Sequence, residues 1–129
     1  MITEDYVSFE TAKLLKEKGF DEICYLGYNK NGEYVPTSNR TNSQIIQPDF
    51  CFICCPTLQM TMKWLREVHN LSVEVYRTAC GYIGCIVAVP SGTDKKVFQY
   101  DGDDEDSGQW TTYEGAVEAA IKYCLENLI

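Results

Sequence analysis

Hydrophobic residues follow a helical repeat in three separate stretches of the chain. The repeat is longest near the C-terminus, where apolar side chains recur every three or four positions from Tyr113 to Leu128. Thr111 and Glu114 have the spacing of a capping box, in which each side chain accepts a hydrogen bond from the other residue's backbone amide. The pattern therefore predicts a final helix that is capped by Thr111.

Two shorter repeats predict helices over 9–18 and 58–68. Ser8 and Thr57 stand directly before them and are typical N-cap residues, because a side-chain oxygen there accepts a hydrogen bond from a free amide of the first turn. Gly19 follows the first of these helices and is expected to adopt the left-handed conformation that ends many helices.

The segments between the helices contain short apolar runs that predict strands. Two runs on either side of 29–32 predict a hairpin, because Asn and Gly tolerate positive φ. The polar stretch 36–49 is expected to be a loop. Three more strands are expected over 71–77, 81–89 and 95–100; the second is apolar throughout and is predicted to be central, and the third to lie at an edge.

These elements predict an α+β fold, in which a mostly antiparallel sheet of about five strands packs with three helices in the order α-β-β-α-β-β-β-α. We expect residues 1–129 to form a single globular domain. The longest apolar runs are shorter than the roughly 18 residues of a membrane span, and the acidic N-terminus does not resemble a signal peptide. We therefore expect a cytoplasmic protein with no membrane role.

The formal net charge of −8 disfavours nucleic-acid binding, which requires Lys and Arg to displace counterions from phosphate. Acidity is compatible with a basic protein partner, but it commonly serves only solubility. The sequence therefore predicts no nucleic-acid partner, and it leaves the identity of a protein partner and the oligomeric state open.

The seven cysteines are expected to be reduced thiols, because no export signal is seen. Cys51 with Cys54, and Cys80 with Cys85, have spacings that suit zinc, which binds four thiolates as a tetrahedron built from two short-range pairs. Bulky apolar residues between the first two cysteines, and the apolar strand predicted around the second pair, count against this site.

The segment CFICCP (51–56) also contains a C-x-x-C spacing that redox sites use. Cys51, however, lies six residues before the predicted cap Thr57, too far for the helix macrodipole to lower its pKa. We favour a third interpretation, in which these cysteines pack as small hydrophobic residues in a buried strand or in the segment that enters the second helix.

The acidic stretch before the last helix matches part of an EF-hand calcium loop, in which several oxygens surround a sharp glycine turn and a glutamate closes the site. The candidate ligands stand at positions 1, 3, 5, 9 and 12 of such a loop, with Gly108 at position 6: Asp103, Glu105, Ser107, Thr111 and Glu114. The glutamate at position 3 and the strand predicted before the loop count against calcium. The alternative is a solvated acidic loop whose Glu114 only caps the helix.

His69 is the single histidine. Together with a cysteine it would permit a thiol hydrolase, but we expect it to end its helix, where a donor meets free carbonyls. Trp64 and Arg66 are residue types that are common at protein contacts, although Trp64 borders the apolar stripe and core packing is preferred for it. The sequence contains no recognisable catalytic set or cofactor motif.

Three stretches resemble, in the same order, a family of small uncharacterised proteins of phages and prophages of gut bacteria: SFETAKLLKEKGF, PTLQMTMKWLREVHN and TYEGAVEAAIKYCLENLI. The resemblance begins at Pro56 in the middle block and does not include the cysteines before it. It implies a phage protein in a bacterial host, and it implies no functional residue for this chain.

The leading hypothesis is a non-enzymatic phage accessory protein that binds a host or phage protein. A metal-binding module that uses either the acidic loop or the cysteine pairs is the alternative, and an enzyme with Cys–His chemistry is a third hypothesis.

Overall fold

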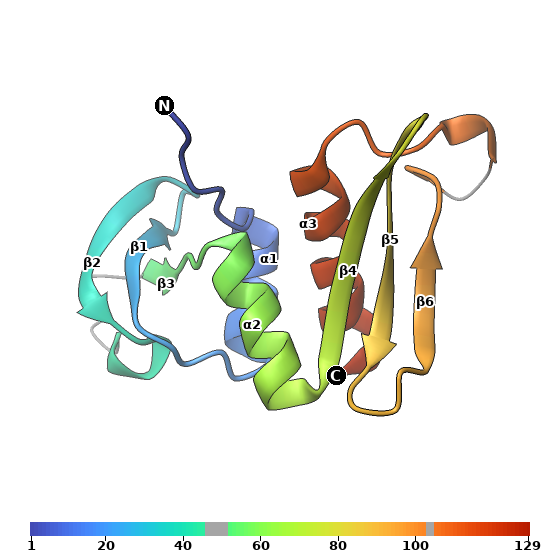
Figure 1. The fold of residues 1–129 in the computed structure, drawn as a ribbon. Coiled ribbons are helices and arrows are strands. Elements are labelled where there is room, and N and C mark those ends of the chain that lie inside the picture. Colours follow the sequence, from blue (N-terminus) through green and yellow to red (C-terminus); the bar gives the residue numbers. More distant parts are fainter. Residues whose placement is uncertain (46–51, 103–104) are drawn as a thin grey trace. The chain divides into compact units, whose positions relative to one another are not determined.

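A computed structural model describes residues 1–45, 52–102 and 105–129, and the chain divides into two compact units, Met1–Met60 and Thr61–Ile129 (Figure 1). The predicted α+β class and the approximate order of the elements are confirmed. The strands form two antiparallel three-stranded sheets, one in each unit. The additional strand is β3 (Phe52–Cys54), which lies in the segment for which a buried strand is one of the two preferred expectations. The expectation of a single globular domain stays a prediction.

The N-terminal unit contains a sheet in the order β2-β1-β3. Its central strand is β1 (Cys24–Asn29), which forms the predicted hairpin with β2 (Tyr34–Arg40). The turn between them uses Gly32 with φ of 79°, a backbone conformation that favours glycine. Helix α1 (Phe9–Glu17) contacts β3.

Both ends of α1 are formed as predicted. Thr11 N donates to Ser8 Oγ at 3.2 Å, which confirms the N-cap. At the other end Gly19 has φ of 89°, and Phe20 N donates to Leu15 O at 2.9 Å. This is the bond expected when a chain leaves a helix through a left-handed glycine.

The loop expected over 36–49 begins later than predicted, because β2 includes its first residues. Since β2 is an edge strand, Pro36 is tolerated there without a backbone N–H. Thr37 is buried, and its hydroxyl donates to the carbonyl of Cys24. The composition of this stretch is typical of a loop. Buried polar contacts nevertheless keep its first residues in the sheet. Residues 46–49 lie outside the described part.

The boundary between the two units, after Met60, falls within the first turn of helix α2 (Leu58–His69). Met60 N donates to Thr57 Oγ1 at 3.1 Å, which confirms the predicted cap. In the described ranges, no helix has the length and hydropathy that crossing a membrane requires.

The C-terminal unit contains the second sheet, in the order β4-β5-β6. Its strands are β4 (Leu71–Thr78), β5 (Gly81–Ala88) and β6 (Asp94–Phe98). The predicted central position of the second strand and the predicted edge position of the third are both confirmed.

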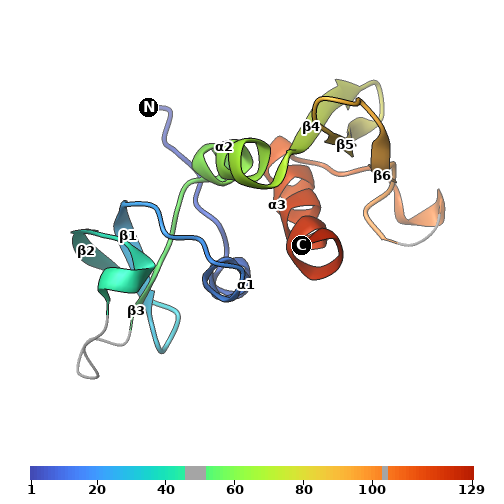
Figure 2. The same ribbon diagram turned by 90° about the horizontal axis from the view of Figure 1, so that it is seen from below.

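Helix α3 (Tyr113–Tyr123) lies against one face of this sheet, chiefly on β4 and β5, and continues into a π-helical turn (Cys124–Leu128) (Figure 2). The predicted apolar stripe is largely buried. Its fully buried members are Ala116, Val117, Ala120, Ile121, Cys124 and Leu125.

The cap of α3 lies one residue later than predicted. Thr112, with φ of −127° and ψ of 149°, is the N-cap, and Gly115 N donates to its Oγ1 at 3.0 Å. A Cβ at position 115 would lie 2.9 Å from this oxygen, so glycine leaves room for the bond. The prediction of a capping box formed by Thr111 and Glu114 is therefore wrong.

The position of this cap can be tested by a pair of substitutions. We expect Thr112→Ala to lower the free energy of unfolding by about 1 kcal/mol, because the amide of Gly115 loses its acceptor. The neighbouring Thr111→Ala is the matched control and is expected to change it by less than about 0.5 kcal/mol. Urea titration measures both, and a larger loss for Thr111→Ala would contradict the observed cap.

Candidate binding site

The structure describes three of the four cysteines of the predicted zinc site. Cys51 lies outside the described residues, and Cys54 is buried at the end of β3 in the N-terminal unit. Cys80 is exposed in the turn before β5, and Cys85 lies five residues further along, in the strand. Extended backbone therefore separates the Cα atoms of Cys80 and Cys85 by more than about 10 Å, too far for two ligands of one zinc ion.

Cys54 instead lies beside Cys24 of β1. The two thiols are hydrogen-bonded to each other, and Cys54 Sγ also donates at 3.3 Å to the carbonyl oxygen of Arg40, the residue paired with Cys24 across the sheet. The bond with Cys54, together with burial, raises the pKa of Cys24. The same bond lowers the pKa of Cys54, and burial opposes this effect.

These thiols pack in the core of the N-terminal unit. Cys54 and Cys55 are no more than 1 % exposed, so the preferred interpretation of CFICCP is confirmed for its two described cysteines. The amide side chain of Asn42 holds β3 in place: its Oδ1 accepts from Cys54 N at 2.9 Å and its Nδ2 donates to Phe20 O at 2.8 Å.

The predicted calcium loop lies only partly in the described residues. Asp103 and the side chain of Glu105 are outside them, whereas Ser107, Thr111 and Glu114 are exposed. In the part of the chain that the structure describes, no three His, Cys, Asp or Glu side chains are grouped so as to hold a metal ion. Calcium binding by this loop stays a prediction.

The structure places His69 at the end of α2, as predicted. Its ring packs edge-on against Trp64, with centroids 4.6 Å apart, and its Nε2 has no hydrogen-bond partner among the described residues. Trp64 is only 6 % exposed, which supports core packing over a partner contact, whereas Arg66 is exposed.

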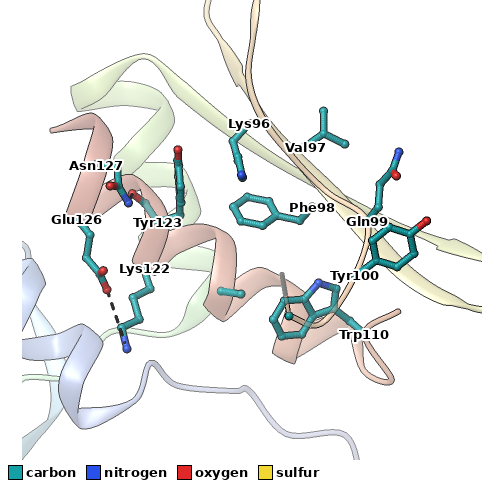
Figure 3. Close-up of a pocket in the computed structure, with 12 residues that line it drawn as sticks. Lys96, Val97, Phe98, Gln99, Tyr100, Trp110, Lys122, Tyr123, Glu126 and Asn127 are labelled. Carbon is teal, nitrogen blue, oxygen red and sulfur yellow. Dashed lines mark hydrogen bonds and ion pairs between the residues drawn. The ribbon is translucent and has the colours of Figure 1, made fainter. Parts of the chain in front are cut away.

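A concave surface lies in the C-terminal unit, between β6 and α3 (Figure 3). This pocket has a volume of about 790 Å³, within the range of roughly 300–1,000 Å³ that is usual for ligand sites. One wall is formed by residues 96–100, Gly102 and Trp110. The other wall is formed by α3 and its final turn, through Ala119, Lys122, Tyr123, Glu126 and Asn127.

The pocket exists because α3 covers only part of the sheet. A helix with its side chains is about 10 to 12 Å wide, whereas neighbouring strands are about 4.8 Å apart. One helix therefore covers about two strands, and α3 packs chiefly on β4 and β5. The face of β6 is left open, and residues 94–97 of that strand are all exposed.

Aromatic rings line this opening. Phe98 on β6 and Tyr123 on α3 meet edge to face, with ring centroids 5.4 Å apart. Lys96 Nζ lies 5.4 Å from the centre of the Tyr123 ring and 5.9 Å from that of Phe98, and Figure 3 shows the three side chains directed toward one another. On the helical wall Lys122 Nζ lies 4.0 Å from Glu126 Oε1.

Trp110 lies at one end of the pocket and is fixed there through its backbone. Its N–H and C=O are both hydrogen-bonded to Tyr82 of β5, at 3.2 and 2.7 Å. Gly81 permits this approach, since a Cβ there would lie 2.7 Å from the Trp110 carbonyl oxygen. The indole Nε1 is buried and has no hydrogen-bond partner among the described residues.

The pocket residues were not recognised from the sequence, although a signal for them is present. On α3 the lining residues 119, 122, 123, 126 and 127 form a second stripe of helical period beside the buried one. This stripe is mostly polar and resembles a solvent-exposed face. Only the neighbouring edge strand, with its aromatic residues, turns it into one wall of a pocket.

Comparison with known proteins gives no relative from which to transfer a function: no protein-family model, no curated protein and no solved structure matches the chain. The functional argument therefore depends on the residues of this chain.

The buried thiol of Cys124 on α3 gives a pH-dependent prediction. Burial raises its pKa from 9.0 to about 12. The unfolded chain releases this proton near its ordinary pKa while the folded chain keeps it, so the stability that Cys124 contributes is present below about pH 9 and is lost as the pH rises toward 12.

We expect the free energy of unfolding of the wild type to fall, between pH 7 and pH 10, by about 1 kcal/mol more than that of Cys124→Ala. The variant keeps a small apolar side chain and has no proton to lose, and the other cysteines are the same in both proteins. Urea titrations at the two pH values measure the difference. Equal losses in the two proteins would show that the Cys124 pKa is not raised.

Proposed function

We propose that the chain is a non-enzymatic accessory protein of a phage or prophage, which acts in the cytoplasm of a bacterial host by binding another protein. The observation that supports this proposal is the open edge of β6 beside the pocket. An edge strand presents unpaired backbone N–H and C=O groups, and an extended segment of a partner can pair with them.

The two edges of this sheet differ in their exposure. Leu71, Ser72 and Val73 of β4 are buried, whereas β6 is exposed from Asp94 to Val97. A segment that pairs with β6 also has a place for its side chains, because the pocket lies next to that strand. β6 is therefore the better of the two edges for strand addition.

Photo-crosslinking tests this proposal. p-Benzoylphenylalanine at Val97 on β6 is expected to give a discrete adduct in a bacterial host lysate, and excess unlabelled protein is expected to compete it away. The matched control carries the same group at Tyr76 on β4, which is 57 % exposed. The proposal is contradicted if neither position gives an adduct, or if both positions give the same set.

A further inference from the structure

The pocket beside β6 also indicates which kind of segment binds there. We infer that it accepts an acidic segment of the partner, which packs an aromatic side chain against the exposed sides of Phe98 and Tyr123 and places a neighbouring carboxylate against Lys96 and Trp110. This inference rests on the proposed strand addition to β6, and it names the chemistry that selects the partner.

The aromatic part of the inference follows from the walls. Phe98 and Tyr123 are only half buried, although together they provide a large apolar area. An aromatic side chain of a ligand covers such rings in edge-to-face or offset-stacked geometry and gains more than the area buried alone would give. The pocket volume of about 790 Å³ leaves room for that ring and for its neighbours in the segment.

Lys96 indicates an acidic group. Its ammonium lies above two rings and forms no ion pair in the part of the chain that the structure describes. The chain carries a net charge of −8, yet the pocket lining holds two lysines and one glutamate, the latter beside Lys122. Lys122 already has a carboxylate beside it and Lys96 has none among the described residues. An anionic group of a ligand is therefore expected to bind at Lys96.

Trp110 independently indicates a hydrogen-bond acceptor. A buried N–H is almost always paired in folded proteins, because leaving it unpaired carries a desolvation penalty. The Nε1 of Trp110 lacks a partner among the described residues. Because Nε1 itself is buried, the indole must turn toward the opening when a ligand binds; a carboxylate oxygen would then accept from it, and the bond would gain strength from the negative charge.

The charges of β6 favour an acidic segment over a second copy of the chain. Two copies that paired through β6 would bring Lys95 and Lys96 of one strand close to the same lysines of the other, and like charges across a strand pair are destabilising. A segment that carries Asp or Glu meets no such repulsion.

A selection from a displayed library of random nine-residue peptides, with the full chain as the target, tests the inference. We expect enriched peptides to carry Asp or Glu within two positions of Phe, Tyr or Trp. Enriched peptides that crosslink at Val97 but show no preference for acidic residues would overturn the inference and leave strand addition standing. If no peptide is enriched, both proposals fail.

Variants of the pocket identify the groups that bind. We expect Lys96→Glu to weaken the best peptide by at least tenfold, while Lys63→Glu, the same charge reversal at an exposed position of α2, leaves its affinity unchanged. Trp110→Phe removes the indole N–H and is expected to weaken binding threefold to tenfold. Its control is Trp64→Phe, and circular dichroism verifies that each variant is folded.

A double-mutant cycle isolates the carboxylate. Changing Asp to Asn, or Glu to Gln, in the peptide is expected to weaken its binding to the wild type, and to have little effect on its binding to Lys96→Met, because the carboxylate then has no ammonium partner. Equal losses with both proteins would overturn the assignment of Lys96. Phenylacetate binding as tightly as the peptide would mark a small-molecule site and overturn the inference of a peptide ligand.

Discussion

The C-terminal unit depends on how one helix covers a three-stranded sheet. The small and branched residues of the α3 stripe, including Ala116, Val117 and Ala120, allow the helix to approach β4 and β5 closely. Such packing excludes water from two strands, but a single helix is too narrow to reach the third. The uncovered β6 is therefore a consequence of the same contact that stabilises the unit.

The chemistry of the pocket follows from this incomplete cover. Phe98 would pack in a core if a second helix lay beside α3, but here its ring meets Tyr123 and the ammonium group of Lys96. Trp110 is anchored through its backbone to Tyr82, and this anchoring fixes the indole at the end of the opening whether or not Nε1 finds an acceptor. The residues that line the pocket thus lie on rigid elements. Binding a ligand therefore costs less conformational entropy of the protein than binding through a flexible loop would.

Local signals in the sequence predicted the fold well where the interactions are local. Ser8, Thr57 and Gly19 act within one turn of their helices, so their roles could be identified from position alone. The cap of α3 was misplaced because Thr111 and Thr112 are adjacent and chemically equivalent. The choice between them depends on the space that Gly115 leaves, which is a property of the folded backbone.

Non-local contacts could not be predicted in this way. Cys24 and Cys54 are distant in sequence, and only the pairing of β1 with both β2 and β3 brings their thiols together. The C-x-x-C spacing drew attention to Cys51 and Cys54 because spacing is the only relation that a sequence displays. In the same way, the acidic run was prominent as a possible ion site, whereas the dispersed residues of the pocket were not.

The overall charge and the local charge of the protein point to different partners. A net charge of −8 favours basic molecules at long range, but this field is screened beyond about 8 Å at physiological ionic strength. Within the pocket, at contact distance, the exposed ammonium group of Lys96 presents a local positive charge. The net charge thus affects how molecules approach the protein, whereas the charges inside the pocket affect which of them would stay bound. Composition reveals the net charge but not the charges inside the pocket.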